Sequence, residues 1–348
     1  MKGVFAIQEE IAQSIADLLR LHVPAARPLM RASSRNLEAY TRYLRARFLL
    51  YQQSPETLRA ALQEFRELIR EYPDYALGYS GIAAGNGFLS LFGVVPGREV
   101  YPEAKATAER GYSLDPESGE TCTVLAGIRA TYEHRWDEAE RLCERALKLQ
   151  PGHASAHMVR GMAFLCQGEI AGAEASLRRS AELDPLSAPD WARLAYLHYV
   201  KGESEAATAH LQHCFERDRD YPEARLYLGL LHFQNQDYDA VIECMSQSRV
   251  SLDIGLLAAA YTRQNSMSRA KQCVDNLAQL SSTHYVTPLA HAFAAIGMED
   301  YNVAFQQLEK AIDDKTNFVN MLGIEPFLKP VRNDRRFTKL LKKLNVSQ

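Results

Sequence analysis

The sequence has no excess of positive charge, which limits the partners that it can hold by charge alone. Its 40 lysines and arginines are outnumbered by 43 aspartates and glutamates, giving a formal net charge of -3. Nucleic acids and anionic membranes attract proteins through surplus basic side chains. We therefore expect neither a nucleic acid nor a membrane as partner of this chain.

Cysteine is sparse, and no two cysteines stand in a paired spacing. Six cysteines are spread over 348 residues without a CxxC pair. Several occupy repeat positions where a small buried side chain is needed, as Cys214 does. We interpret them as reduced thiols that act as small hydrophobic groups, which favours a cytoplasmic location.

Long apolar runs are scarce as well. The first residues carry no secretory signal, because a short apolar stretch (residues 4–7) is followed at once by Gln8-Glu9-Glu10. One uncharged run, Ala76 to Gly97, is long enough to span a bilayer, but it contains six glycines and Pro96. We interpret this run as a buried helix followed by a loop.

Catalytic motifs are missing. The sequence has no GxSxG, no phosphate-binding glycine loop and no HExxH. His153 and His157 are four residues apart, and His210 and His213 are three apart, but no nearby cysteine or carboxylate completes a recognisable metal-ligand set. We expect a chain without enzymatic activity, cofactor or metal.

What the sequence does contain is a period of 34 residues between Glu120 and Val250. Three sets of positions keep this interval: Gly127, Gly161, Ala195 and Gly229; Ala139, Ala173, Ala207 and Val241; and Ala146, Ser180, Cys214 and Ser248. Self-similarity at this period is typical of stacked helical hairpins. The pattern predicts an all-α, right-handed α-solenoid of about eight antiparallel helix pairs.

Small residues at fixed points have a physical cause. Two helices joined by a short turn approach closely only if bulky side chains are absent where their axes cross. We expect residues 127, 161, 195 and 229 to lie at such crossings. A leucine in place of Gly161 should overpack the crossing, at a cost of about 1–3 kcal/mol.

The rest of the chain divides around this array. Apolar residues at three- and four-residue steps predict a helix over 4–21, and residues 1–35 are interpreted as this helix plus a linker, either a cap or the remnant of a preceding domain. Residues 36–316 form the array, with regular units over 120–250, and 317–348 close it with a capping helix. An insertion between Leu91 and Tyr101 should lengthen one first helix and add a loop.

The regular units resemble the tetratricopeptide repeat (TPR). Trp136-Asp137-Glu138-Ala139 and Asp237-Tyr238-Asp239 are similar to the start of that family's second helix, and Leu183-Asp184-Pro185 is similar to its unit ending. Trp191 stands at the family's tryptophan position. Arg160, Arg219 and the long second unit depart from the pattern.

The two ends resemble a narrower group. Residues 4–12 are similar to a segment ahead of TPR arrays in multidomain bacterial regulators, and Pro326-Phe327-Leu328 with the residues up to Leu341 is similar to the end of those proteins. The resemblance implies an array that is joined to an adenylate cyclase, a Ser/Thr kinase or a winged-helix domain. None of these output domains is present in the 348 residues.

The resemblance also implies a concave groove lined by the first helix of each unit. Its binding residues would be apolar and aromatic, with one polar anchor: Val124, Ile128, Met158, Met162, Arg193, Tyr196, Tyr199, Leu230 and Phe233. Positions 131, 165, 192 and 226 would complete the lining. The Lys/Asn/Arg set with which some TPR proteins hold a C-terminal carboxylate is absent.

Two interpretations of the groove stay open. Either a protein partner inserts a peptide or helix there, because Met and Tyr adapt to irregular surfaces, or the chain's own segments fill it. The leading hypothesis is a non-enzymatic protein–protein interaction scaffold. The alternative is a regulatory or sensory segment of a bacterial signalling protein, acting through domain contacts or as a homo-oligomer.

Overall fold

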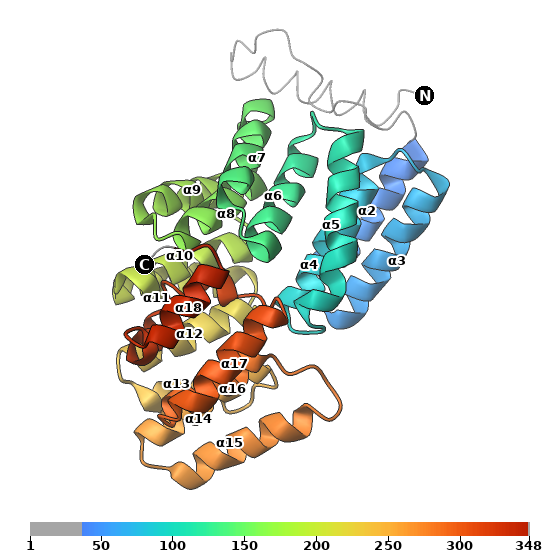
Figure 1. Ribbon diagram of the computed structural model, residues 1–348. Coiled ribbons are helices and arrows are strands. Elements are labelled where there is room, and N and C mark those ends of the chain that lie inside the picture. The colour runs from blue at the N-terminus through green and yellow to red at the C-terminus, as the bar shows by residue number, and fades with distance from the viewer. Residues whose placement is uncertain (1–36, 347–348) are drawn as a thin grey trace.

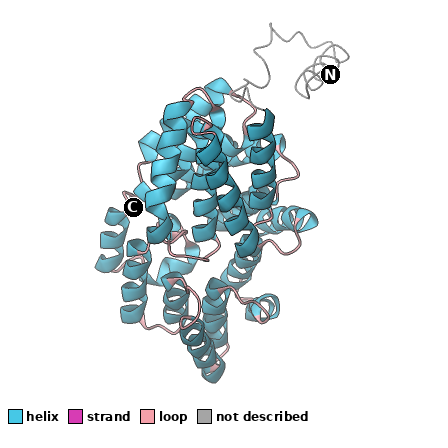
Figure 2. Ribbon diagram, turned by 90° about the vertical axis from the view of Figure 1, so that its right-hand side faces the viewer, coloured by secondary structure: helices cyan, strands magenta, loops and turns pink. Residues whose placement is uncertain are grey.

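The computed structural model describes residues 37–346, and this part of the chain consists of helices and loops (Figure 2). Eight helical hairpins follow one another here. Their helices are α2 (Leu37–Tyr51) and α3 (Pro55–Glu71), α4 (Ala76–Leu91) and α5 (Gly97–Leu114), α6 (Gly119–Glu133) and α7 (Trp136–Leu149), α8 (Ala154–Cys166) and α9 (Ile170–Leu183), α10 (Ala188–Lys201) and α11 (Ser204–Arg217), α12 (Pro222–Gln234) and α13 (Tyr238–Met245), α14 (Ser251–Arg263) and α15 (Met267–Leu280), and α16 (Pro288–Gly297) and α17 (Tyr301–Asp313).

A different kind of segment closes the described part of the chain. Two short 3-10 helices, η1 (Val319–Met321) and η2 (Pro326–Val331), are followed by the α-helix α18 (Arg335–Lys343). Figure 1 shows α18 lying across the middle of the stack instead of extending it at the end. The predicted helix over 4–21 and its linker lie outside the described residues.

The hairpins stack in chain order into a solenoid (Figure 1). Each helix packs on the other helix of its own pair, and the first helix of every later pair also packs on the second helix of the preceding pair. The expected all-α solenoid of about eight helix pairs is thereby confirmed.

Local sequence explains where the helices begin. Ser54 is the N-cap of α3, where its side-chain oxygen accepts a hydrogen bond from the Thr57 backbone N–H (3.2 Å). The Thr57 hydroxyl in turn accepts from the Ser54 backbone N–H (3.1 Å), and Pro55 occupies the first helical position. These bonds satisfy backbone donors that a helix start leaves free.

The close approach at the hairpin crossings holds for Gly161 and Gly229. A Cβ atom on Gly161 would stand 2.7 Å from Leu177 Cγ, and one on Gly229 would collide with the Met245 side chain. Ala195 at the same repeat position is buried. Gly161 and Gly229 need to be small because a large side chain fills the facing site.

The expectation is wrong for Gly127. A Cβ atom there would meet nothing within 4 Å. The facing repeat position, sixteen residues further on, holds Leu177 for Gly161 but only Cys143 for Gly127. The smaller side chain of Cys143 leaves room at this crossing. Packing therefore does not require a glycine at position 127.

The insertion in the second hairpin lengthens the first helix and adds a loop, as expected, and it also lengthens the second helix. α4 has 16 residues, one more than α6, and residues 92–96 form the loop. α5 has 18 residues, against 14 in α7. The first turn of α5 is anchored, since the Arg98 backbone N–H donates to the Asp314 carbonyl (2.9 Å) and the Arg98 guanidinium pairs with the Asp314 carboxylate. The insertion thus reaches the C-terminal segment.

The uncharged run from Ala76 contains a buried helix, as predicted. It forms α4, with Ile82, Ala83 and Leu89 in the core, and then a loop. None of the helices between residues 37 and 346 combines the length and apolar character that crossing a bilayer requires.

Candidate protein-binding groove

The nine predicted binding residues all lie on first helices: α6, α8, α10 and α12. Four of them are half-buried, namely Val124, Met158, Met162 and Phe233. The other five are buried: Ile128, Arg193, Tyr196, Tyr199 and Leu230. Tyr196 and Tyr199 are each 1% exposed, so something covers the surface that they were expected to offer to a partner.

The cover is the chain's own residues 318–331, called the groove segment below. The Tyr196 hydroxyl donates a hydrogen bond to Glu325 Oε2 (2.8 Å), and the Tyr199 hydroxyl donates to Glu325 Oε1 (2.6 Å). The backbone N–H of Phe327 donates to the same Oε1 (3.0 Å). Burial raises the pKa of the Glu325 carboxyl, whereas these hydrogen bonds oppose the rise.

Aromatic side chains complete the contact. The Phe327 ring stacks on Phe293 with centroids 4.6 Å apart and meets Phe233 edge-on at 5.0 Å. Phe318 meets Tyr227 edge-on at 6.3 Å. Pairs of this geometry add to the free energy gained from apolar burial. The groove therefore holds a stretch of chain with two short 3-10 helices, through one carboxylate and through aromatic contacts.

In the described conformation the chain's own groove segment fills this part of the groove, because it contacts Tyr196, Tyr199 and Phe233. Their assignment to partner binding, like that of the other six residues, stays a prediction. The sequence had marked Pro326-Phe327 only as part of an end motif. An acidic and an aromatic residue two positions apart, next to an array with an apolar groove, was the available signal.

Arg193 does not face an open groove as a free anchor. Its guanidinium pairs with the Glu223 carboxylate and also donates to the Tyr227 hydroxyl (3.0 Å). The Tyr221 hydroxyl donates to the other oxygen of Glu223 (2.6 Å). All four side chains are buried, and a buried charge is tolerated when it is paired in this way. The residue is used to join α10 to α12.

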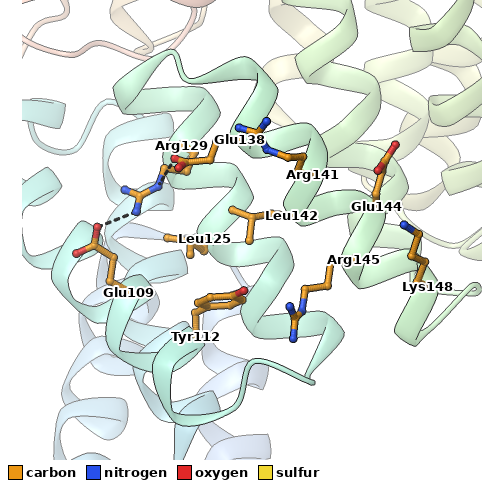
Figure 3. A pocket seen from close by; sticks show the side chains of 10 residues that line it. All are labelled: Glu109, Tyr112, Leu125, Arg129, Glu138, Arg141, Leu142, Glu144, Arg145 and Lys148. Atoms are coloured by element: carbon orange, nitrogen blue, oxygen red, sulfur yellow. Dashed lines mark hydrogen bonds and ion pairs between the residues drawn. The ribbon is translucent and has the colours of Figure 1, made fainter.

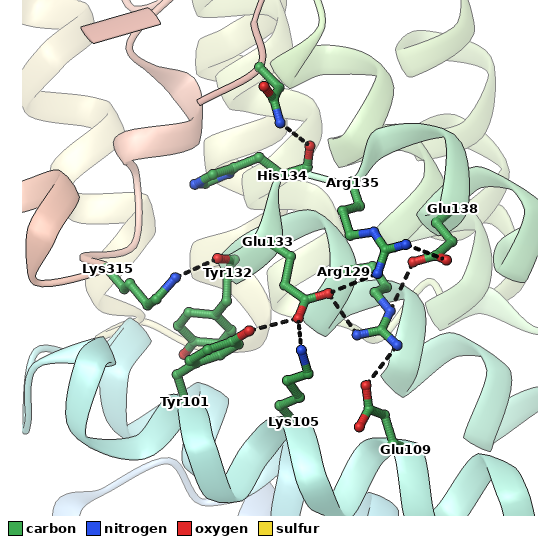
Figure 4. Close-up of polar contacts among 11 residues, drawn as sticks. Tyr101, Lys105, Glu109, Arg129, Tyr132, Glu133, His134, Arg135, Glu138 and Lys315 are labelled. Atoms are coloured by element: carbon green, nitrogen blue, oxygen red, sulfur yellow. Dashed lines mark hydrogen bonds and ion pairs between the residues drawn. The ribbon is translucent and has the colours of Figure 1, made fainter. Parts of the chain in front are cut away.

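A second polar network joins α5, α6 and α7 close to Lys315 (Figure 4). Glu133 accepts hydrogen bonds from Tyr101, Lys105 and Arg129, each at 2.6 Å. Burial alone would raise the pKa of Glu133, but the bonds from Lys105, Tyr101 and Arg129 outweigh it and hold the pKa at about 2. Glu133 is therefore ionised at neutral pH.

Lys315 links this network to the C-terminal part of the chain. Its ammonium donates to the Tyr132 carbonyl (2.8 Å) and lies 4.4 Å from the centre of the Tyr101 ring (Figure 4). Burial lowers the pKa of Lys315, with the nearby Glu133 opposing that effect. The residues just before the groove segment are thus fixed to the third hairpin.

An open depression of about 700 Å³ is lined by residues of α5, α6 and α7 (Figure 3). Leu125 and Leu142 belong to its lining, and Arg141, Arg145 and Lys148 follow one side of α7. Glu109 belongs to the opposite side, where it pairs with Arg129 (2.8 Å). The mixture of charges offers a polar contact surface and no nucleophile–base pair.

The two histidine pairs are not assembled into metal sites. His153 Nε2 lies 3.6 Å from Glu120, and His210 packs between Trp191 and His198 with ring centroids 5.7 and 5.0 Å away. Within residues 37–346, no three histidine, cysteine or carboxylate side chains stand close enough together to hold a metal ion.

Comparison with known proteins identifies the repeats. Residues 124–188 and 192–240 match the tetratricopeptide repeat family model. The chain therefore contains tetratricopeptide repeats, and they lie in the regular part of the array, as the sequence predicted. No curated protein matches the chain.

Solved structures show the same fold. The chain is similar to the human IFIT1 dimer with m7Gppp-AAAA (TM-score 0.61, 13% identity, 98% of this chain and 76% of that chain). It is also similar to the APC/C hetero-tetramer Cut9–Hcn1 (0.58, 19%, 90% and 57%) and to a tetratricopeptide repeat protein from Parabacteroides merdae (0.50, 14%, 81% and 99%). At these identities, the likeness concerns the fold alone.

Proposed function

We propose that this chain is a non-enzymatic protein-interaction scaffold that binds a peptide or helix in its concave groove. The proposal rests on how the groove holds the chain's own segment. Glu325 accepts hydrogen bonds from Tyr196 and Tyr199. Phe327 packs against Phe233. A groove that holds one such segment within the chain has the shape and the donors to hold a similar one from a partner.

The partner peptide then carries a carboxylate and, two residues later, an aromatic ring. It takes the place of the groove segment, whose own contacts compete with it. Because only the fraction of molecules with an open groove can bind, the apparent affinity is reduced by that fraction. Weakening the groove segment should therefore strengthen peptide binding.

The test uses the full chain and a fluorescent peptide of residues 318–333, followed by fluorescence anisotropy. Phe327→Ala removes the ring between Phe293 and Phe233 from the chain, but the labelled peptide keeps it. Such a truncation costs about 3–5 kcal/mol where the ring is buried. We expect the variant to bind the peptide at least about tenfold more tightly than the wild type does.

Lys329→Ala is the matched control, because Lys329 lies on η2 but is exposed. It should bind the peptide as weakly as the wild type. A peptide with glutamine for Glu325 and alanine for Phe327 should bind neither protein. If the folded Phe327→Ala variant fails to bind the unchanged peptide, the groove is a permanent internal contact and the proposal is wrong.

The alternative is a regulatory segment of a bacterial signalling protein that works through domain contacts or self-association in the cytoplasm. The occupied groove favours this alternative. When residues 318–331 cover the inner surface, only the outer surface of the solenoid is open to other domains or to a second copy of the chain. Sedimentation of the wild type over a range of concentrations distinguishes the two. Self-association that persists when Phe327→Ala opens the groove supports the alternative.

A further inference from the structure

The first described helix, α2, exposes a stripe of large apolar side chains. Leu44, Phe48 and Tyr51 recur at steps of four and three residues and are 44%, 68% and 59% exposed. The opposite face of α2 packs Tyr43 and Leu50 into the core with α3 and α4. A helix that is apolar on both faces is normally covered on both.

The uncovered face has a defined place in the architecture. From α4 to α16, each first helix packs on the second helix of the preceding hairpin, as α4 does on α3 and α8 on α7. Among residues 37–346, α2 has no such preceding helix. Its stripe therefore occupies the position where the second helix of an earlier hairpin would pack.

We propose that residues 4–21 of the same chain dock on this face of α2 and take the place of that missing helix. These residues lie outside the described part of the chain, but their sequence has the required form. Val4, Ile7, Ile11, Ile15 and Leu18 recur at steps of three and four, which forms one apolar stripe in a helix.

The connecting length allows the contact. Residues 22–36 separate the segment from Leu37, and fifteen residues can span up to about 50 Å when extended. Eighteen helical residues measure about 27 Å, and the fifteen residues of α2 about 22 Å. The segment can therefore turn back and lie along the whole of α2.

Charge also fits. Among the described residues Arg45 has no ion-pair partner, and it is exposed on one flank of the apolar stripe of α2. In the segment, Glu10 and Asp17 are seven residues apart, on one flank of the apolar stripe. A carboxylate beside the stripe would reach the guanidinium as the apolar side chains meet.

Hydrogen exchange of the full chain tests the docking, with a free peptide of residues 1–36 as reference. A lone helix of this length is marginal in water, so lasting protection of its amides requires packing. We expect the amides of residues 7–19 to exchange at least about tenfold more slowly in the chain than in the peptide. Phe48→Asp should remove that protection, while circular dichroism stays that of a folded solenoid.

Leu186→Asp is the control, since Leu186 is 80% exposed in a loop far along the chain, and it should leave the protection unchanged. Arg45→Glu should weaken the protection, and adding Glu10→Lys should restore part of it. Unprotected amides in the wild type, or protection that survives Phe48→Asp, overturn the proposal. A dimer that Phe48→Asp dissociates, with the amides of 7–19 unprotected, would assign the face to a second copy. The result does not depend on peptide binding in the groove.

Discussion

The indole nitrogen of Trp136, at the start of α7, donates a hydrogen bond to the backbone carbonyl of Asn345 (3.0 Å). These residues are 209 positions apart in the chain. The Asn345 side chain also approaches the His134 carbonyl (3.4 Å). The residues just after α18 are therefore attached to the third hairpin, and these contacts join the middle of the superhelix to its C-terminal part.

Trp136→Phe should lower the free energy of unfolding by about 1–2 kcal/mol, because it removes this hydrogen bond and some buried volume. It should also speed hydrogen exchange over residues 335–346. Trp191→Phe is the matched control, since Trp191 donates a similar bond to Pro185 within its own unit (3.0 Å). If both variants change exchange at the C-terminus equally, the Trp136 bond does not hold that segment.

Gly127 and Gly161 should respond in opposite directions to alanine. Gly127→Ala should stabilise the protein by about 0.5–1 kcal/mol, because a Cβ atom has open space there and glycine weakens a helix. Gly161→Ala should destabilise it by about 1–3 kcal/mol, because the new Cβ meets Leu177. Urea unfolding measures both changes, and equal signs would show that the crossing is not tight at Gly161.

Asp253 should make stability depend on pH. Burial raises its pKa to about 6, with hydrogen bonding from Ser248 and the charge of Arg225 opposing the rise. A raised folded-state pKa means that the folded state binds the proton more tightly. The contribution of this group is therefore most favourable below the unfolded pKa of about 4 and is lost as pH rises to about 6. The difference is on the order of 3 kcal/mol.

Asp253→Asn should flatten the slope of unfolding free energy between pH 4 and pH 6, as measured by urea unfolding at several pH values. Asn keeps a side-chain oxygen for the bond from Ser248 (2.6 Å), and Arg225 is partly exposed. Asp313→Asn, at an exposed site on α17, should leave the slope as it is. An unchanged slope in Asp253→Asn would assign the pH dependence to other groups.

Tyr199 and Glu325 should be energetically coupled. Tyr199→Phe removes a donor to a buried carboxylate, which costs about 1.5–3 kcal/mol for a bond to a charged group. The same change in a Glu325→Gln background should cost less, since the neutral amide accepts more weakly. A double-mutant cycle on unfolding free energies gives the coupling, and a coupling near zero would mean that the bond contributes nothing in solution.

Much of this fold could be predicted from the sequence. The period of 34 residues required stacked hairpins, and the buried helix from Ala76 was recognisable because it has no charge. The prediction was wrong at Gly127 because a small residue repeated every 34 positions shows only that each crossing tolerates a small residue. Whether the crossing needs them depends on the facing residue, which is Leu177 in one unit and Cys143 in another.

The groove illustrates a different limit. The side chains of Tyr196 and Tyr199 were placed on the correct inner surface, but nothing in their spacing shows what covers them. Glu325 and Phe327 are more than 120 residues away, and no repeat relation connects them with α10. The contact depends on how far the superhelix turns between α10 and residue 325.

By itself the sequence determined the helical hairpins, their order and which face of each helix is apolar, because these follow from local spacing and nearest-neighbour packing. Only the tertiary structure decided that the C-terminal segment returns to α7, α10 and α12 and occupies the groove. The physical reason is that each of the eight hairpins adds a rotation to the superhelix. The summed rotation brings the inner surface of the middle units within reach of residues 314–346.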